Sequence, residues 1–350
     1  MKHQTTRYGE IPFYKIGTFG NTADAFISKK LFLEYQTKYS FPKKGDILIS
    51  ASGTIGRAVI YDGKPAYFQD SNIVWIDNDE TLVKNDFLFY AYSHVKWNTE
   101  HTTILRLYND NFRNTLIPLP PLNEQIAIAN ILSDVDHYLY SLDALILKKE
   151  SVKKALSFEL LSQRKRLKGF NQAWQRVRLG DICEIVKGQQ INKISLNNTD
   201  KYPVINGGID FLGYTNKFNV SKNTIAISEG GTCGYVRFMT SNFWSGGHNY
   251  SLQKISNKVN NLCLYHILKS YEKDIVKLGV GSGLKNIQLK ALKDFEIPLP
   301  PLNEQIAIAN ILNDLDKEIA SLKNKKSQFE NIKKALNHDL MSTKIRVLKK

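Results

Sequence analysis

The sequence predicts an α+β protein in which two mixed α/β domains are separated by a long antiparallel two-helix coiled coil with internal pseudo-two-fold symmetry. Three observations predict this class. One segment occurs twice without a change, each copy continues into a long uninterrupted helical pattern, and the stretches before the two copies are rich in short β-type runs.

The repeat divides the chain into four parts. Ile117–Leu132 recurs unchanged as Ile297–Leu312, 180 residues further on. A shorter likeness precedes each copy, because Ser-x-x-Gly-Thr-x-Gly occurs at 50–56 and again at 228–234. Between these segments the two halves differ almost completely. We therefore predict variable domains at 1–116 and 169–296 and constant long helices at 117–168 and 297–350.

Each constant segment opens with Pro-Leu-Pro-Pro, whose prolines stop the preceding strand. Asn123 and Asn303 follow as predicted helix N-caps. Glu124 and Glu304 lie in the predicted first turn, where a carboxylate complements the helix dipole. No Gly or Pro interrupts the first copy before Gly169. The pattern therefore predicts one long helix in each copy.

Apolar residues alternate at spacings of three and four, which is typical of a coiled-coil seam. In the two copies they are Ile128, Leu132, Val135, Leu139, Leu142, Ile146, Val152, Leu156 and Leu160, and Ile308, Leu312, Leu315, Ile319, Leu322, Phe329, Ile332, Leu336 and Leu340. Lys149 and Lys326 also fall on this stripe. The alternative is two amphipathic helices docked on separate cores, but about 40 residues exceeds the usual length of such helices. Pairing of the two helices is the preferred interpretation.

The variable domains combine β-rich runs with turn residues. Predicted strands are Asp46–Ser50, Asn72–Ile76 and Thr224–Ser228, and helices are predicted near 86–97 and 261–273. The Gly-Thr-x-Gly element is either a phosphate cradle built from backbone amides or a hairpin turn that needs positive φ angles. The hairpin is the preferred interpretation.

Charge points to a polyanionic partner. The chain of 350 residues has a formal net charge of +15, which attracts polyphosphates, although a solvated lysine-rich surface would give the same excess. No apolar run is long enough to cross a membrane. Cys183, Cys233 and Cys263 have no metal-ligand spacing, and we expect reduced thiols in the cytoplasm. His248 has no second ligand nearby in sequence, so no metal site is predicted.

The residues that we expect to contact DNA are polar or basic side chains near the predicted turns, because such side chains hydrogen-bond to base edges and phosphates. They are Lys15, Arg57, Asn72, Arg106, Asn109, Arg113, Lys187, Gln189, Gln190, Asn206, Tyr235, Arg237, His248, Asn249, Lys285 and Asn286. For any single one of them, a solvated surface or turn role is the preferred interpretation. No catalytic residue is predicted.

The glycine turn, the Pro118–Gln125 motif with its repeat, the long helix and the duplication together resemble the specificity subunit of Type I restriction–modification systems. The resemblance covers nearly the whole chain. It implies two target-recognition domains joined by two antiparallel helices, with each domain reading one half of a split DNA sequence and helix length setting the gap. The resemblance therefore implies that this chain binds DNA and is not itself a catalyst.

The resemblance also implies partners. These are double-stranded DNA, two modification subunits that methylate adenine, and restriction subunits that translocate and cleave DNA. S-adenosylmethionine, ATP and Mg²⁺ would belong to those subunits, and this chain is expected to hold no cofactor. In agreement, the sequence has no Walker phosphate loop, adenine-methylation tetrapeptide or nuclease carboxylate set.

The two domains differ at their start. Trp174–Ile185 resembles the usual opening strand of the family, whereas Ile11-Pro12-Phe13 already matches Tyr202–Val204. About twenty residues are therefore expected to be absent before the first domain, and the tail to Lys350 does not supply them. Either the chain is truncated or this domain folds without the strand, which bears on its DNA reading.

Two other classes of function remain open. One is a free-standing DNA-binding regulator that dimerises through its coiled coil, and the other is a scaffold whose basic helices bind an acidic protein. The duplication argues against the regulator, because one chain already carries both predicted readers. A steep salt dependence of duplex binding would separate DNA readers from a scaffold.

Overall fold

The computed structural model describes residues 4–68, 72–97 and 105–348 of the chain. It divides into two compact units, which we describe separately: unit 1 comprises Met1–Asp143 and Asn324–Lys350, and unit 2 comprises Ala144–Lys323. The two long helices, α4 (Leu122–Leu161) and α9 (Leu302–Met341), contribute to both units. The predicted domain limits remain predictions.

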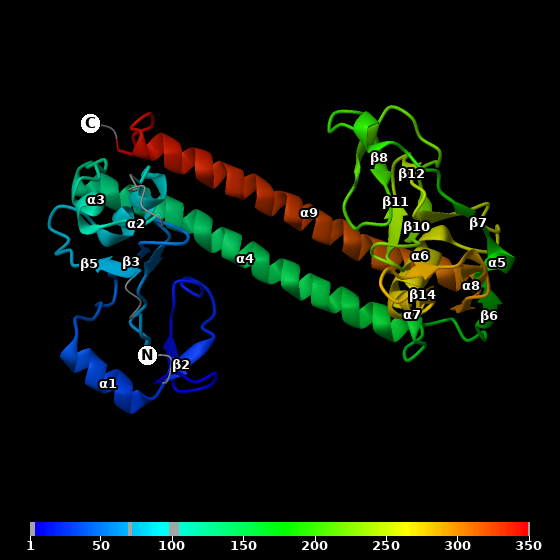
Figure 1. Ribbon diagram of the computed structural model, residues 1–350, viewed down its shortest axis with the longest axis horizontal. Helices are drawn as coiled ribbons and strands as arrows, with labels where there is room; N and C mark the ends of the chain where they lie inside the picture. The colour runs from blue at the N-terminus through cyan, green and yellow to red at the C-terminus, as the bar shows by residue number, and fades with distance from the viewer. Residues whose placement is uncertain (1–3, 69–71, 98–104, 349–350) are drawn as a thin grey trace. The chain divides into compact units, whose positions relative to one another are not determined.

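The described residues of unit 1 form two small sheets and three short helices besides the long ones (Figure 1). Strands β1 (Ile11–Phe13) and β2 (Ala25–Ile27) form an antiparallel pair, and β3 (Ile47–Ser50) lies between β4 (Ala58–Ile60) and β5 (Ile73–Ile76). The helices are α1 (Lys29–Lys38), α2 (Asn85–His94) and α3 (Asn109–Arg113). Leu88 and Tyr92 of α2 pack on Ile47 and Ile49 of β3. This core fixes the turn that follows β3.

Unit 2 is built around a four-stranded antiparallel sheet of order β11-β10-β13-β7. Its elements are β6 (Gln175–Arg178), α5 (Leu179–Ile182), β7 (Glu184–Lys187), a 3-10 turn η2 (Lys193–Ser195), β8 (Tyr202–Ile205), β9 (Gly213–Thr215), β10 (Thr224–Ser228), β11 (Val236–Met239), β12 (Trp244–Ser245), β13 (Asn249–Gln253), α6 (Asn261–Ser270), α7 (Glu272–Lys277), β14 (Gly279–Val280), β15 (Asn286–Ile287), α8 (Leu289–Lys293) and β16 (Glu296–Leu299). Strands β12, β8 and β9 form a second sheet, while β14 pairs with β15 and β16 pairs with β6. Ile225 and Ile227 of β10 and Leu264 of α6 are fully buried in one core.

The long helices pair within each unit. In unit 1, Asp136 and Lys333 are 2.5 Å apart and Asp143 and Lys326 are 2.7 Å apart, so residue numbers rise on α4 as they fall on α9. The Tyr138 and Phe329 rings lie between these pairs, with centroids 4.6 Å apart. The pairing is therefore antiparallel in unit 1.

The same direction holds in unit 2. Lys149 pairs with Glu318 at 2.8 Å, and Lys153 forms an ion pair with Asp316. Lys149, like Lys326 in unit 1, lies on the predicted stripe, and its charge is matched by a carboxylate of the facing helix. The α+β class with paired long helices is thereby confirmed.

Most predicted elements match closely. The three predicted strands are β3, β5 and β10. The first predicted helix ends earlier, at His94, because Val95 is extended. The second divides into α6 and α7 at Tyr271.

Two predictions are wrong in detail. Both long helices begin one residue before the predicted caps, so Asn123 and Asn303 lie in the first turn. The reason is that the first helical hydrogen bonds run to the prolines: the Gln125 and Gln305 amides donate to the Pro121 and Pro301 carbonyls at 3.0 Å. The run Trp174–Ile185 is also not one strand, since it contains β6, α5 and the start of β7.

Candidate nucleic-acid interface

The glycine turn has the same conformation in both units. Gly53 and Gly56 have φ angles of 67° and 77°, and Gly231 and Gly234 have 69° and 80°. The Gly56 amide donates to the Ser50 carbonyl at 2.9 Å, and Gly234 donates to Ser228 at the same distance. Because these amides are used inside the turn, the geometry favours the hairpin interpretation over a phosphate cradle.

In unit 2 three loops meet at this turn: 206–211, 229–235 and 246–249, which we call the unit 2 loop cluster. The Thr232 amide donates to the Gly207 carbonyl at 2.8 Å, and the Gly246 amide donates to Ile205 at 2.8 Å. A Cβ on Gly207 would lie 2.6 Å from the Gly230 carbonyl oxygen. The loops therefore approach backbone to backbone, which glycine permits.

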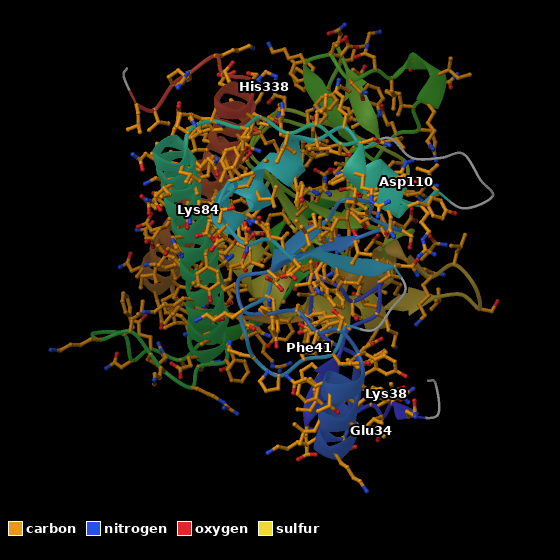
Figure 2. All side chains as sticks on the ribbon, turned by 90° about the vertical axis from the view of Figure 1, so that its left-hand side faces the viewer. Glu34, Lys38, Phe41, Lys84, Asp110 and His338 are labelled. Carbon is orange, nitrogen blue, oxygen red and sulfur yellow. The ribbon has the colours of Figure 1, made fainter. Side chains whose placement is uncertain are left out.

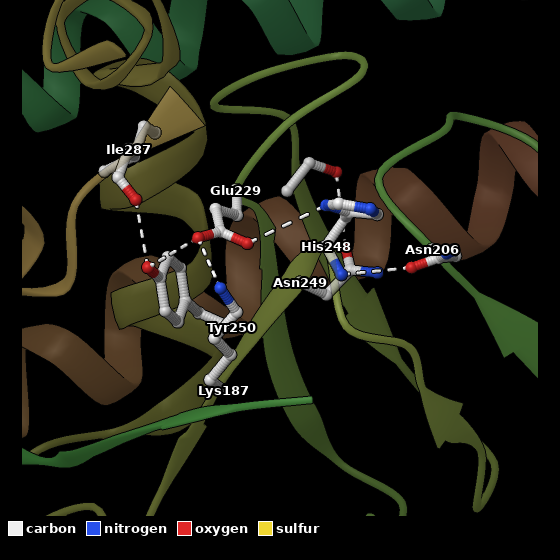
Figure 3. A network of polar contacts seen from close by, with 8 residues as sticks. Lys187, Asn206, Glu229, His248, Asn249, Tyr250 and Ile287 are labelled. Atoms are coloured by element: carbon white, nitrogen blue, oxygen red, sulfur yellow. Dashed lines mark hydrogen bonds and ion pairs between the residues drawn. The ribbon is translucent and has the colours of Figure 1, made fainter. Parts of the chain in front are cut away.

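A buried carboxylate organises the polar side chains of this cluster (Figure 3). Glu229 Oε1 accepts a hydrogen bond from Lys187 Nζ at 2.7 Å, and Glu229 Oε2 lies 4.0 Å from His248 Nδ1. The His248 amide donates to Asn206 Oδ1 at 3.0 Å. Lys187 and His248 keep about half of their side-chain surface exposed. Glu229 thus holds Lys187 through a hydrogen bond, and the half-exposed His248 ring lies next to the same carboxylate.

Tyr250 also belongs to this network through its hydroxyl group. Its hydroxyl lies 3.2 Å from Glu229 Oε1 and 2.9 Å from the Ile287 carbonyl oxygen. Burial, and next the charge of Glu229, raise the pKa of Tyr250 to about 12. The phenol therefore remains a hydrogen-bond donor at neutral pH.

Arg237 of β11 lies beside two aromatic rings of the unit 2 loop cluster. The Arg237 guanidinium lies 5.1 Å from the Phe211 ring centre and 5.4 Å from that of Tyr235. Lys269 Nζ stands 4.1 Å from the Tyr235 ring centre. These rings border an open hollow of about 390 Å³ that also includes Asp210. The rings hold the guanidinium in place. Arg237 Nη2 also donates to the Gly208 carbonyl at 3.5 Å.

In unit 1 several predicted residues gather around the equivalent turn. Arg57 Nη1 donates to the Phe19 carbonyl at 2.9 Å, and the Asn72 carbonyl accepts from Ala51 at 2.6 Å. Arg106 forms a β-bridge with Ser52, and its guanidinium lies 5.7 Å from the Tyr108 ring centre. Lys15 pairs with Asp24 at 3.1 Å.

The remaining predicted residues are placed less uniformly. Asn109 and Arg113 lie at the two ends of α3, and Arg113 pairs with Asp110 at 3.3 Å. The Gln189 backbone binds Ser245 and Trp244, Gln190 lies against Gly247, and Asn286 lies against Gly230 with Lys285 beside it. Asn249 is only 2% exposed, and its Oδ1 accepts from Ser228 at 3.4 Å. Its burial argues against direct contact with a base.

Sequence reasoning missed Glu229, Phe211 and Lys269. A signal for Glu229 existed, because it is a charge that directly follows the apolar run Thr224–Ser228. A carboxylate in such a place needs buried partners. Phe211 carried no signal, since an exposed aromatic beside an arginine becomes visible only in three dimensions.

Two searches of the described residues bear on other kinds of site. Among them, no group of three or more His, Cys, Asp and Glu side chains is placed to hold a metal ion. No helix in the same residues is both long and apolar enough for a membrane span.

Comparisons with known proteins agree with this geometry. The model of the Type I restriction modification DNA specificity domain matches residues 1–149 and again 171–331. A specificity subunit of the type I restriction enzyme MjaX from Methanocaldococcus jannaschii is 30% identical over 87% of this chain and 79% of that protein. A type I specificity subunit from Haemophilus influenzae is 64% identical, but over 38% of this chain and 34% of its own length. A crystal structure of a Type-I restriction-modification S subunit from M. genitalium has a TM-score of 0.72 and 22% identity, covering 97% of this chain and 91% of that one.

Proposed function

Because this chain belongs to the family of Type I restriction modification DNA specificity domains, we propose that it reads a two-part DNA sequence as the recognition subunit of a Type I restriction–modification complex. The family assignment confirms the resemblance found in the sequence. One observation supports the two-part target most directly: the domain model matches twice, and each matched stretch contains one glycine-turn domain.

Side chains of unit 2 would contact one half of the two-part DNA sequence. Arg237 is the best donor for a guanine edge, since a guanidinium can bond O6 and N7 together. Lys187 and His248 are suited to phosphates or acceptor edges, because Glu229 orients them. The residues around the unit 1 turn, among them Arg57 and Arg106, differ from those of unit 2 and would read the other half of the DNA sequence.

The long helices support a fixed gap between the two halves. A helix of 40 residues rises about 60 Å, or roughly 17 base pairs at about 3.4 Å each. Deleting one heptad from both helices should shorten the gap and leave the bases read unaltered.

The family also supports partners for this chain. We propose that two methyltransferase subunits and the restriction subunits assemble on it in the cytoplasm, with S-adenosylmethionine, ATP and Mg²⁺ bound by those subunits. No catalytic step is assigned to this chain, and its relatives are specificity subunits.

Duplex binding tests the proposal. Affinity for a cognate duplex should fall by about 10³–10⁵ between 50 and 200 mM salt, because many phosphate contacts release counterions. The variant Arg237→Ala should lower affinity by roughly ten-fold or more and relax selectivity at one base pair of one half.

Arg176→Ala is the matched control. Arg176 is an exposed arginine of unit 2 on β6, outside the loop cluster, and its removal should leave affinity and selectivity unchanged. A nearly flat salt dependence would favour a protein-binding scaffold. Equal losses from both variants would remove Arg237 from the interface.

A further inference from the structure

The repeated helix start is covered in unit 2 and open in unit 1. In unit 2, β16 pairs with β6 in antiparallel register, with Ile297 opposite Val177 and Leu299 opposite Gln175. Ile297 is fully buried, and Trp174 and Val177 pack on the core of the unit. An extended segment thus shields the backbone just before α9.

The equivalent segment of unit 1, Leu116–Leu119, has no such neighbour. It forms no strand, and among the described residues no backbone hydrogen bond joins it to another segment. Leu116 is 93% exposed and Leu119 is 59% exposed. A hollow of about 260 Å³ beside it is lined by Pro118, Leu119, Phe87, Ile128, Leu340 and Arg346. An apolar hollow next to an unpaired backbone is the arrangement that accepts an added strand.

The carboxylate beside the hollow has a different set of donors in unit 1. Glu304 accepts from two nitrogens of Arg166, Nε at 2.7 Å and Nη2 at 2.6 Å, and from the Trp174 indole at 3.0 Å. Glu124 is bound in the same two-pronged way by Arg346. Its carboxylate also accepts from the Val347 backbone amide, and among the described residues it receives no indole.

The exposure of the two arginines reflects this difference. The Arg166 side chain, whose guanidinium lies 5.9 Å from the Trp174 ring centre, is 25% exposed, while Arg346 is 49% exposed. Arg346 therefore repeats the ion pair of unit 2, whereas none of the described residues adds a covering strand.

We propose that Leu116–Leu119 and its hollow form a docking site for an extended peptide segment with the chemistry of Ala173–Arg178. That occupant would place an indole over Glu124 and Arg346 and an apolar side chain opposite Ile117, as Trp174 and Val177 do in unit 2. This inference does not depend on the proposed function, because it rests on the two copies of one sequence.

One residue of the site predicts which side chain of the occupant is preferred at the position of Arg176. Leu116 stands where Glu296 lies in unit 2, and Glu296 pairs with Arg176 at 3.4 Å. The site in unit 1 therefore gives no carboxylate to that arginine. An occupant with an apolar residue there should bind at least as tightly.

Titration of the full chain with a labelled synthetic peptide tests the proposal. A peptide matching residues 171–181 should bind saturably, as measured by fluorescence anisotropy. Its Trp174→Ala version should bind at least about ten-fold more weakly, because the indole loses its burial and a hydrogen bond to a carboxylate. Its Arg176→Val version should bind as well as the parent or better.

Variants of the chain locate the site. Leu119→Asp should abolish binding, and Glu124→Gln should weaken it, while thermal unfolding reports whether each variant is folded. The matched control is Leu284→Asp, a similarly exposed leucine in unit 2, which should leave binding unchanged.

Hydrogen exchange gives a second readout. Peptide binding should protect the amides of Ile117 and Leu119. Protection of 296–299 instead would mean that the peptide replaces β6, and it would overturn the proposal. Absence of saturable binding, or equal binding by the Trp174→Ala peptide, would overturn it as well.

Discussion

The start of α4 in unit 1 and the start of α9 in unit 2 bind dissimilar domains through the same contacts. Gln125 Oε1 accepts from the Lys84 amide at 2.8 Å, next to α2. Lys84 is labelled in Figure 2. Gln305 Oε1 accepts from the Asn260 amide at 2.7 Å, next to α6. The Gln125 amide donates to the Leu82 carbonyl, and the Gln305 amide donates to that of Lys258. Because only backbone atoms of the domain are used, its side chains can change without loss of these bonds.

The two units diverge where the long helices meet domain side chains. Tyr90 in unit 1 donates to Asp136 at 2.9 Å, and Asp136 also binds Lys333. The corresponding ring in unit 2 is His266, which lies close to the ion pair of Asp316 and Lys153. One scaffold therefore carries a phenol in one unit and an imidazole in the other.

The largest expected effect is a difference in the free energy of unfolding between matching variants at the two helix starts. Glu304→Ala should lower the free energy of unfolding by about 3 kcal/mol, because it leaves Arg166 partly buried without its carboxylate. Glu124→Ala should cost clearly less, since Arg346 is more exposed. Hydrogen exchange of α6 and α2 measures each unit separately. Equal losses would show that the indole and the covering strand add nothing.

The next largest effect is a pH dependence of the free energy of unfolding that arises from unit 2. Burial, opposed by the nearby charge of Asp316, lowers the pKa of His266 from 6.5 to about 4. Between these values the unfolded chain binds a proton that the folded chain does not. The free energy of unfolding should therefore fall by roughly 3 kcal/mol as pH drops from 6.5 to 4, and the contribution is fully present above pH 6.5.

His266→Gln isolates this contribution. It should flatten the dependence of unfolding free energy on pH in this window, as measured by urea titration at several pH values. Tyr90→Phe in unit 1 is the control, because burial raises the pKa of Tyr90 and it does not titrate there. An unchanged slope in His266→Gln would mean that the imidazole titrates normally.

The glutamine contacts should give a similar cost in both units. Gln125→Ala and Gln305→Ala each leave a buried amide and carbonyls without partners, at a cost of about 2 kcal/mol. Urea unfolding of the two variants checks this. Losses that differ widely would contradict attachment through backbone atoms alone.

The smallest effect concerns the charges along the paired helices. Lys149→Met should cost about 0.5 kcal/mol at low salt, because its pair with Glu318 is partly exposed. The loss should disappear in high salt. A loss that persists in high salt would assign Lys149 a packing role instead.

Much of this fold could be predicted from the sequence, because repeats and heptads are local patterns. Strand β10 matches its predicted range, and both long helices were found. The Glu124–Arg346 pair could not be predicted, since its members are 222 residues apart. Nor could the Lys187–Glu229 pair, which depends on the meeting of β7 with the turn after β10. Spacing reveals which residues share a helix face, but not which loops fold together.

The candidate site was predicted only as a set of residue types. Lys187, Asn206 and His248 do lie in one network, whereas Asn249 is buried beneath it. Sequence could not separate these neighbours, because alternation along a strand is lost where it enters a turn. Their contacts with DNA remain predictions.

Exchange of one domain tests the central claim most directly. Residues 169–296 are replaced by the equivalent domain of another family member, and methylated adenines are mapped in cells that supply the methyltransferase subunits. The account predicts that one half of the methylated sequence changes while the other half and the gap stay the same. A change in both halves, or in neither, would contradict it.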